Sequence, residues 1–277
     1  MKQYLDLVER VLTTGKKKSD PQKIGNLAVL GHEMRFRPAE EFPLITVRSL
    51  KGSWKAIVHE LLWFLSGSSR VEDLHKYNVH LWDVWANEET CKPLGLETGD
   101  LGPIYGPQWR RWKTRTGGEI DQIQREVLDV LKTNPDSRRL MVTPWNPEDL
   151  NKVFIVPCHG PFKFFHAEGE LSLHVFHRSA DTILGVPFDI AEYALLLLMV
   201  AQVTGFRPAE LVTTLSDTHI YFNHLEVARE LLSREPRPLP RVTLNPDAKD
   251  LFNFKFEDFT LENYDPHPPI KGIPVGY

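Results

Sequence analysis

The chain has 277 residues, of which 42% are hydrophobic and 25% are charged. This composition excludes a disordered or collagen-like chain, and the length is sufficient for one large domain or two small ones. The formal net charge of −4 at pH 7 supplies no general basic field, so nucleic acid is not the expected partner and a small anion would need a local arginine cluster.

Cysteine content and apolar segments indicate the compartment. Cys91 and Cys158 are too few and too far apart for a repeated disulfide or zinc framework, with a single bridge as the alternative. The N-terminal sequence MKQYLDLVERVL alternates charged and apolar residues, which is typical of a first helix and not of a signal peptide. The apolar stretch 193–202 is shorter than a bilayer requires. We therefore expect a cytoplasmic protein without a membrane partner, in the cytosol of the producing or host cell.

The hydrophobic pattern predicts a mixture of helices and strands. Helix 2–12 is followed by strand 26–36 and helices 55–65 and 120–132; strands 140–144, 162–166 and 171–178 come next, before helices 190–203 and 223–233 and strand 241–244. The lysines at 16–18 are expected to form a solvated helix end, with anion binding as the alternative. Proline-rich pieces at 236–240 and 266–269 are typical of surface turns. Without a regular strand-helix repeat, this order predicts an α+β fold in a single domain over residues 1–277.

Several generic enzyme motifs are absent. No Gly-x-Gly-x-x-Gly follows a predicted strand and no Gly-Lys-Ser/Thr loop occurs, which excludes the usual dinucleotide and P-loop sites. His59 and Glu60 resemble the start of a zinc-protease motif, but Trp63 stands where the second histidine is needed, so no metal is expected. Glu60 would lie at the edge of an apolar helix face, where desolvation raises the pKa of a carboxyl; a solvated or salt-bridged acid is the alternative.

Five further residues could carry chemistry. Cys158 is held between Pro157 and the turn His159-Gly160-Pro161 at a strand end, where His159 and nearby arginines would favour the thiolate; a buried inert cysteine is the alternative. Arg138, Arg139 and Arg178 suit a dianionic phosphate, or equally surface salt bridges. Asp189 stands where a turn leads into an apolar helix, and helix capping is the alternative role.

Twelve segments, taken together, carry a wider similarity: GHEMRF, FPLIT, HELLWFLSG, LWDVWA, DLGPIYGPQWR, PDSRR, PCH, RSAD, GVPFDIAEYALL, DTHIYFNH, LSREPRPLP and YDPHPPIK. In this order, and over nearly the whole chain, they resemble the thymidylate synthase family. The resemblance implies an α+β fold whose mixed twisted sheet forms a homodimer interface. It also implies one-carbon transfer to C5 of a pyrimidine nucleoside monophosphate, with 5,10-methylenetetrahydrofolate as co-substrate and no metal.

The resemblance also implies a role for each matching residue. Cys158, with His159 beside it, would be the nucleophile that attacks C6, and Glu60 with ordered water would move protons at the ring. Arg178 would hold the phosphate together with Arg138 and Arg139 of the partner subunit. The remaining contacts would come from Ser179, His219, Tyr221 and Lys23 for the nucleotide, with His219 and Tyr221 on the sugar 3′-hydroxyl, and from Trp82, Trp85, Asp181 and Tyr277 for the folate.

Departures from the family pattern bear on the substrate. Asp189 replaces the asparagine of enzymes that act on dUMP, and a carboxyl group fits cytosine, which offers an acceptor at N3 and a donor at N4. Glu192, on the same helical face, is expected to help keep Asp189 protonated by like-charge repulsion. Pro21 stands where the family has a phosphate-binding arginine, which Lys23 or Arg48 would have to replace. The C-terminal residues 271–277 differ from the usual tail that closes over folate, and a looser lid would admit water.

These departures predict a hydroxymethylase that acts on dCMP, or on CMP, since Phe222 beside Tyr221 alters the sugar neighbourhood. Trp82 and Trp85 would shield the intermediate from water, so methylation of dCMP is an alternative. Thymidylate synthesis from dUMP with a tolerated Asp189 is another. The last alternative is that the protein is a non-catalytic relative that binds a nucleotide or RNA.

Overall fold

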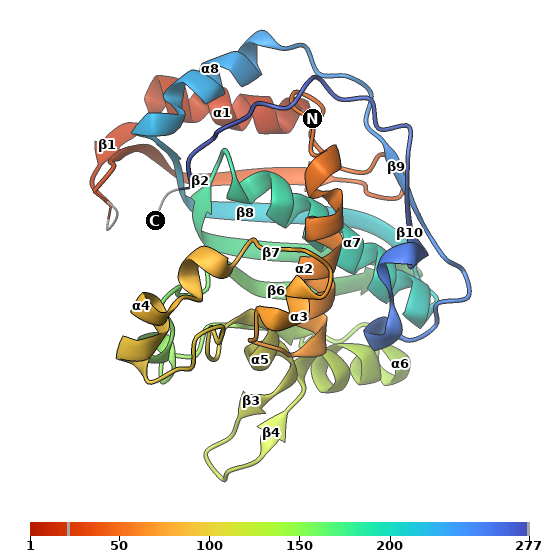
Figure 1. Ribbon diagram of the computed structural model, residues 1–277. Coiled ribbons are helices and arrows are strands. Elements are labelled where there is room, and N and C mark those ends of the chain that lie inside the picture. The colour runs from red at the N-terminus through yellow and green to blue at the C-terminus, as the bar shows by residue number, and fades with distance from the viewer. Residues whose placement is uncertain (21–22, 276–277) are drawn as a thin grey trace.

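A mixed six-stranded sheet forms the centre of the fold (Figure 1). The structure, a computed structural model, describes residues 1–20 and 23–275. In spatial order the strands are β1 (Lys16–Lys18), β2 (Asn26–Phe36), β8 (Arg207–Tyr221), β7 (Glu170–Asp181), β6 (His159–Ala167) and β5 (Met141–Val142). Only β7 and β8 pair in parallel; the other neighbours in this sheet are antiparallel. The sheet and the surrounding helices confirm the predicted α+β class.

Alternating side chains separate the two faces of the sheet. Along β7, Leu171, Leu173 and Val175 are buried against the helices, whereas His174 and Phe176 point the other way. This period of two is what a half-buried strand requires.

Helices cover the buried face of the sheet. Helix α1 (Lys2–Thr14) packs on β2 and β8, and α7 (Gly185–Thr204) packs on β7 and β8. Helix α2 (Trp54–Ser66) crosses α7 and contacts α5 (Tyr105–Arg110), while α8 (Leu225–Ser233) lies beside α1 (Figure 1). Burying a leucine or isoleucine side chain contributes roughly 1.5–3 kcal/mol, so the apolar α7 is a main source of core stability.

Helix α7 also meets the length and composition criteria for crossing a membrane. Among the described residues, 1–20 and 23–275, it alone does so, yet 78% of its apolar window is buried inside the structure. A core helix that is apolar on all sides passes the same criteria. The apolar stretch 193–202 is therefore part of a longer apolar helix than the sequence predicted.

Short elements complete the chain. The remaining helices are α3 (Glu72–His75), α4 (Glu88–Cys91) and α6 (Asp129–Thr133), the last preceded by a π-helical turn at Ile123–Leu128. Two small antiparallel ladders pair β3 (Trp112–Lys113) with β4 (Glu119–Ile120), and β9 (Arg241–Leu244) with β10 (Phe259–Glu262). Short 3₁₀ turns lie at Lys51–Ser53, Asp83–Trp85, Lys92–Leu94, Leu150–Lys152, Phe222–His224, Leu251–Asn253 and Phe256–Asp258.

Several predicted elements need correction. The lysines at 16–18 are exposed as expected, but they form strand β1 on β2 and not a helix end, because α1 ends at Thr14 and the extended Gly15 redirects the chain. The predicted helix 120–132 is shorter and begins as a π-helical turn. The 15-residue strand β8 was not predicted, because polar side chains interrupt its alternation. Cys91 and Cys158 are both free, in agreement with the preferred reading of the sequence.

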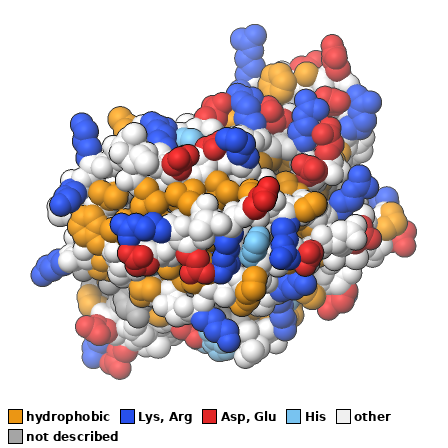
Figure 2. Space-filling model, turned by 90° about the horizontal axis from the view of Figure 1, so that it is seen from above, with side chains coloured by type: hydrophobic (Ala, Val, Ile, Leu, Met, Phe, Trp, Pro, Cys, Tyr) orange, Lys and Arg blue, Asp and Glu red, His pale blue; other side chains and the backbone are white. Residues whose placement is uncertain are grey.

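The opposite face of the sheet carries exposed aromatic side chains. Phe165 on β6 is 60% exposed and Phe176 on β7 is 38% exposed, and His174 donates to or accepts from Thr214 on the same face. We call this surface the open face. A different view, from above, shows lysine and arginine interspersed with acidic side chains and a band of hydrophobic ones (Figure 2). That face presents no continuous basic surface.

Candidate functional site

Cys158 lies directly before β6, in a loop fixed from two sides. Its backbone N–H donates to the hydroxyl of Tyr105 over 2.7 Å, and its carbonyl oxygen accepts from the backbone N–H of Arg178 over 2.9 Å. The guanidinium of Arg178 lies with Nη2 3.8 Å from Sγ of Cys158. The structure therefore brings Arg178 next to Cys158.

The electrostatics of the thiol differ from the sequence prediction. Burial raises the pKa of Cys158, and the negative charge of Asp189 adds to this, while Arg178 acts in the opposite direction. The net direction is upward, because the arginine does not outweigh desolvation. Arg178 also donates to the carbonyl oxygens of Pro157 and Val156, each over 2.8 Å.

The strands next to Cys158 bring the predicted nucleotide-binding residues to one end of the sheet. In the parallel β7–β8 register, Asp181 pairs with His219, and Ser179 pairs with Asp217. The rings of His219 and Tyr221 lie 5.0 Å apart at their centroids. The structure thus places Arg178, Ser179 and Asp181 from β7 and His219 and Tyr221 from β8 around the Cys158 loop. In the sequence, the residues from β7 and those from β8 are separated by the whole of helix α7.

Other predicted phosphate ligands lie outside this cluster. Arg138 and Arg139 are exposed between α6 and β5, and within residues 1–20 and 23–275 neither guanidinium has an ion-pair partner. Lys23 is exposed in a loop that packs on the end of β8, where Gly25 O accepts from Phe222 N over 2.9 Å. Arg48 is buried and donates to the carbonyl oxygen of Ile183 over 2.7 Å. Pro21 lies outside the described residues.

Two acidic side chains meet where α2 crosses α7. Glu60 accepts a hydrogen bond from Nε1 of Trp82 over 2.6 Å and is 9% exposed, while Glu192 is 4% exposed. Burial raises the pKa of Glu60, as predicted, despite hydrogen bonds from Glu192 and Trp82. Burial, with the adjacent charge of Glu60, also holds the pKa of Glu192 well above its ordinary value.

Asp189 lies in the second turn of α7 between two buried histidines. Its Oδ2 is 3.3 Å from Nδ1 of His177, and its Oδ1 is 3.8 Å from Nε2 of His159. Burial opposes ionisation of Asp189, but the two histidines outweigh it and lower the pKa of this carboxyl. The prediction that Glu192 keeps Asp189 protonated is therefore wrong, because the pKa of Asp189 is set by His159 and His177 and is lowered. Asp189 also lies inside the helix and does not cap it.

His159 is fixed by aromatic neighbours. Its Nδ1 lies 2.7 Å from the hydroxyl of Tyr193, and its ring stacks on Tyr105 at a centroid distance of 4.2 Å. Burial lowers the pKa of His159 to about 4, so the ring is neutral at pH 7. Sequence reasoning did not identify Tyr105, His177 or Tyr193 as parts of the site. Tyr105 and Tyr193 lie in segments that carry the family resemblance, whereas only the pairing of His159 with His177 across β6 and β7 reveals His177.

Trp82, one of the predicted folate-binding residues, donates to Glu60 and packs on Trp85. The rings of Trp82 and Trp85 lie 5.4 Å apart in an edge-to-face arrangement, and Nε1 of Trp85 is buried with no hydrogen-bond partner in the described part of the chain. Asp181 accepts from the backbone N–H groups of Ile183 and Leu184 over 2.9 and 3.2 Å, so it holds the turn that leads into α7. Tyr277 lies outside the described residues.

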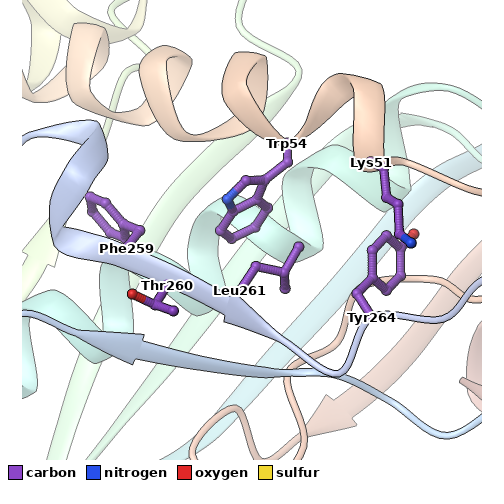
Figure 3. Close-up of a pocket in the computed structure, with 6 residues that line it drawn as sticks. All are labelled: Lys51, Trp54, Phe259, Thr260, Leu261 and Tyr264. Carbon is purple, nitrogen blue, oxygen red and sulfur yellow. The ribbon is translucent and has the colours of Figure 1, made fainter.

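Two cavities lie away from Cys158. The first, of about 520 Å³, is lined by Lys51, Trp54, Phe259, Thr260, Leu261 and Tyr264, between the start of α2 and strand β10 (Figure 3). The second, of about 750 Å³, lies near Trp63, Arg70 and Phe256. Neither is lined by a predicted site residue, so the volumes do not identify the site; the convergence of side chains around Cys158 does.

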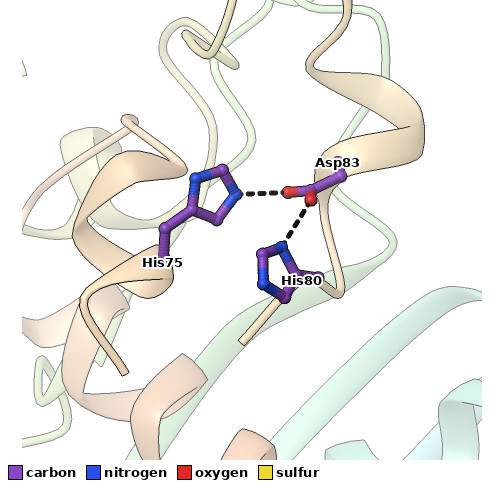
Figure 4. A group of neighbouring side chains, drawn as sticks. All are labelled: His75, His80 and Asp83. Atoms are coloured by element: carbon purple, nitrogen blue, oxygen red, sulfur yellow. Dashed lines mark hydrogen bonds and ion pairs between the residues drawn. The ribbon is translucent and has the colours of Figure 1, made fainter. Parts of the chain in front are cut away.

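His75, His80 and Asp83 form a further cluster that the sequence did not single out (Figure 4). Nε2 of His75 and Nδ1 of His80 each lie 2.7 Å from a separate oxygen of Asp83. These side-chain types can hold a divalent cation, but the mutual hydrogen bonds already account for their arrangement. Hydrogen bonds from both histidines outweigh partial burial and lower the pKa of Asp83.

A comparison with known protein families agrees with the arrangement around Cys158. The family model for thymidylate synthase matches residues 2–275. Members of that family transfer a one-carbon group from methylenetetrahydrofolate to C5 of a pyrimidine nucleotide, and they are typically homodimers. The match extends over nearly the whole chain, and on this ground the chain belongs to the thymidylate synthase family.

Proposed function

We propose that this protein hydroxymethylates C5 of dCMP. The observation that carries the proposal is Asp189, a carboxyl placed between His159 and His177 and close enough to Cys158 to act on its ionisation. An ionised Asp189 accepts from the 4-amino group of cytosine and from a ring protonated at N3. Addition of sulfur to C6 makes N3 more basic, so the covalent adduct strengthens this pairing. Uracil would instead set its O4 against the carboxylate, a buried mismatch that costs about 1–3 kcal/mol.

The chemistry begins at Cys158. Attack of its thiolate on C6 moves the ring electrons toward C5, which then takes the methylene group that methylenetetrahydrofolate supplies. Arg178 orients the nucleotide phosphate and supports the thiolate from 3.8 Å. Glu60, held by Trp82, handles protons at the ring through ordered water. His219 and Tyr221 bind the sugar 3′-hydroxyl, Ser179 and Lys23 complete the nucleotide site, and Trp85, Asp181 and Tyr277 contribute to the folate site.

Hydration of the exocyclic methylene completes hydroxymethylation. One observation favours a methyl product instead: Trp82 and Trp85 pack edge to face beside Glu60, and an aromatic wall there would keep water from the intermediate. Hydride transfer from the folate would then give a methylated cytidylate. The two outcomes share every step up to this intermediate.

We also propose that the active form is a cytoplasmic homodimer that pairs through the open face. Phe165 and Phe176 leave apolar area on that face. Arg138 and Arg139 come just before the edge strand β5, and neither guanidinium has an ion-pair partner in the part of the chain that the structure describes, so in a dimer they could reach the phosphate site of the partner subunit. Exposed apolar surface of this kind is typical of an association surface.

Incubation with methylenetetrahydrofolate and dCMP, CMP or dUMP tests the substrate. Turnover of dCMP with a product heavier by a hydroxymethyl group is expected. A product heavier by a methyl group, together with dihydrofolate absorbance, would support methylation, and turnover of dUMP alone would overturn the cytosine assignment. Cys158→Ser should abolish turnover and retain nucleotide binding; unchanged binding without any turnover by the unsubstituted protein would instead indicate a non-catalytic relative.

A further inference from the structure

His177 interrupts an apolar series on the buried face of β7. The preceding positions of that face hold Leu171, Leu173 and Val175. His177 is 1% exposed, and neither of its ring nitrogens makes a regular hydrogen bond with a residue in the described part of the chain. A buried imidazole in this state costs stability compared with an aliphatic side chain, so a contact other than a hydrogen bond must explain its presence.

The ring of His177 faces the carboxyl of Asp189. Nδ1 lies 3.3 Å from Oδ2, at an angle that does not give a regular hydrogen bond. The residues opposite His177 in the sheet are Leu215 on β8, which is apolar, and His159 on β6. An ordinary imidazole binds a proton more tightly than an ordinary carboxyl, so the proton in this contact belongs to Nδ1.

A second N–H faces the other oxygen of Asp189. Nε2 of His159 lies 3.8 Å from Oδ1, and Nδ1 of the same ring lies 2.7 Å from the hydroxyl of Tyr193. Burial raises the pKa of Tyr193 well above its ordinary value, so this hydroxyl keeps its proton and donates it to Nδ1. Burial lowers the pKa of His159 to about 4, so the ring is neutral at pH 7 and its single proton lies on Nε2.

The other titratable groups around Asp189 do not favour its negative charge. Desolvation opposes ionisation of this carboxyl. Acidic groups from α2, α5, α7 and the loop before β6 also interact with it; they are Glu60, Tyr105, Glu192, Tyr193 and Cys158. None of these side chains carries positive charge, so it is His159 and His177 that hold Asp189 as a carboxylate.

The protonation state of Asp189 decides how strictly it distinguishes the two bases. A protonated carboxyl has one donor and one acceptor, so it can pair with N3 and the 4-amino group of cytosine or, turned over, with O4 and N3–H of uracil. A carboxylate has acceptors only. It therefore rejects O4 of uracil and accepts from both donors of a cytosine protonated at N3.

We propose that His177 is a positioning residue that holds Asp189 in its ionised, acceptor-only form and thereby makes the protein reject uracil. The proposal rests on the proposed function, in which Asp189 reads the base. His177 acts only through Asp189, and its contact with that carboxyl, at 3.3 Å, is closer than the 3.8 Å contact of His159.

His177→Leu tests the proposal, because leucine continues the apolar series of β7 and removes both ring nitrogens. Steady-state kinetics gives the ratio of kcat/KM for dCMP to that for dUMP between about pH 6 and about pH 8. In the unsubstituted protein this ratio should not decrease as the pH falls. In His177→Leu it should decrease toward low pH, by about tenfold at about pH 6, because Asp189 then takes up a proton and also pairs with uracil.

A purely structural role of His177 would lower both rates at every pH and leave their ratio unchanged, and this result would overturn the proposal. His177→Asn is the matched variant. Its amide nitrogen can take the place of Nδ1 and present an N–H to Asp189. Recovery of the unsubstituted ratio in His177→Asn, at low pH, would support the proposal.

Carbon-13 NMR of the aspartate carboxyls in the nucleotide-free protein separates this proposal from the proposed function, because it needs no substrate. The Asp189 signal is identified by its loss in Asp189→Asn. It should remain that of a carboxylate from about pH 8 to about pH 6, whereas in His177→Leu it should begin to protonate within this range. An unchanged Asp189 signal in His177→Leu would overturn the proposal. The expected signals in a protein that turns over only dUMP would refute the dCMP assignment and leave the action of His177 on Asp189 standing.

Discussion

Asp189 and His177 are in direct contact, with Oδ2 of the carboxyl 3.3 Å from Nδ1 of the imidazole. The acid comes from α7 and the histidine from β7, so the contact joins the core helix to the sheet beside the Cys158 loop. His159 approaches the second oxygen of the same carboxyl. Both histidines favour the carboxylate, which is the form of Asp189 that an N3-protonated cytosine requires.

Asp189→Asn is expected to shift the preference from dCMP toward dUMP. An amide accepts from uracil N3–H and donates to O4, whereas a cytosine protonated at N3 offers donors at both N3 and the 4-amino group, so the amide N–H would meet one of them. Loss of one buried hydrogen-bond match costs about 1–3 kcal/mol, so the ratio of kcat/KM for the two nucleotides should change by one to two orders of magnitude. Steady-state kinetics with both nucleotides measures this ratio. An unchanged ratio would show that Asp189 does not contact the base.

The stability of the protein should decrease as the pH falls from about 6.5 to about 4. The pKa of His159 is lowered to about 4 in the folded protein by burial, whereas an unfolded histidine titrates near 6.5. Within this window the unfolded chain binds a proton that the folded protein does not, so protonation favours unfolding. The contribution reaches about 3 kcal/mol at full titration.

Urea unfolding at fixed protein concentration, across this pH window, measures the effect. His159→Gln removes the titrating ring and should flatten the dependence of the unfolding free energy on pH. Protonation of Asp189 acts in the same direction at lower pH, because the pKa of this carboxyl is also lowered in the folded state. An identical slope in the variant and the unsubstituted protein would contradict the assignment to His159.

Alkylation of Cys158 in the nucleotide-free protein should have an apparent pKa above that of an ordinary thiol. Burial disfavours the thiolate, and Arg178 compensates only in part. Arg178→Ala should raise the apparent pKa further, since it removes the positive charge 3.8 Å from Sγ. The rate of carboxamidomethylation against pH gives both values in a Cys91→Ser background. A lower apparent pKa after Arg178→Ala would show that the guanidinium does not support the thiolate.

The sequence was sufficient for the fold class and for the two strands with clear alternation, β2 and β9, whose limits agree with the prediction. It was not sufficient for β8, in which Ser216, Asp217 and His219 interrupt the apolar pattern because that end of the strand faces the site. Polar residues selected for a site remove the periodicity that identifies a strand.

The same limit applies to the candidate site. Motifs located Cys158, Glu60 and Arg178, but not the partners that set their charge. Glu192 was assigned to Asp189 because both lie on one face of one helix, whereas Glu60, from α2, raises the pKa of Glu192 more than Asp189 does. Such contacts between helices depend on how α2 crosses α7, and spacing along a single helix does not determine that crossing.

We expect the double variant Arg138→Ala/Arg139→Ala to be inactive alone, and likewise the single variant Cys158→Ser. A mixture of these two variants should recover activity. If the arginines serve the partner's phosphate site, a mixed dimer has one site with an intact cysteine and intact arginines, while its other site carries both lesions. Random exchange of protomers in a twofold-symmetric dimer would therefore restore about one quarter of the unsubstituted activity. Activity measured after co-refolding equal amounts of the two variants tests this expectation.

Arg178→Ala mixed with Cys158→Ser is the matched control. Arg178 lies 3.8 Å from the sulfur of its own chain, so every site in that mixed dimer carries one lesion and the mixture should stay inactive. Both mixtures contain the same cysteine variant and differ only in which arginine is lost. Failure of the Arg138→Ala/Arg139→Ala mixture to recover would place these arginines outside the partner's phosphate site, whereas recovery in the control mixture would show that Arg178 also acts across the interface.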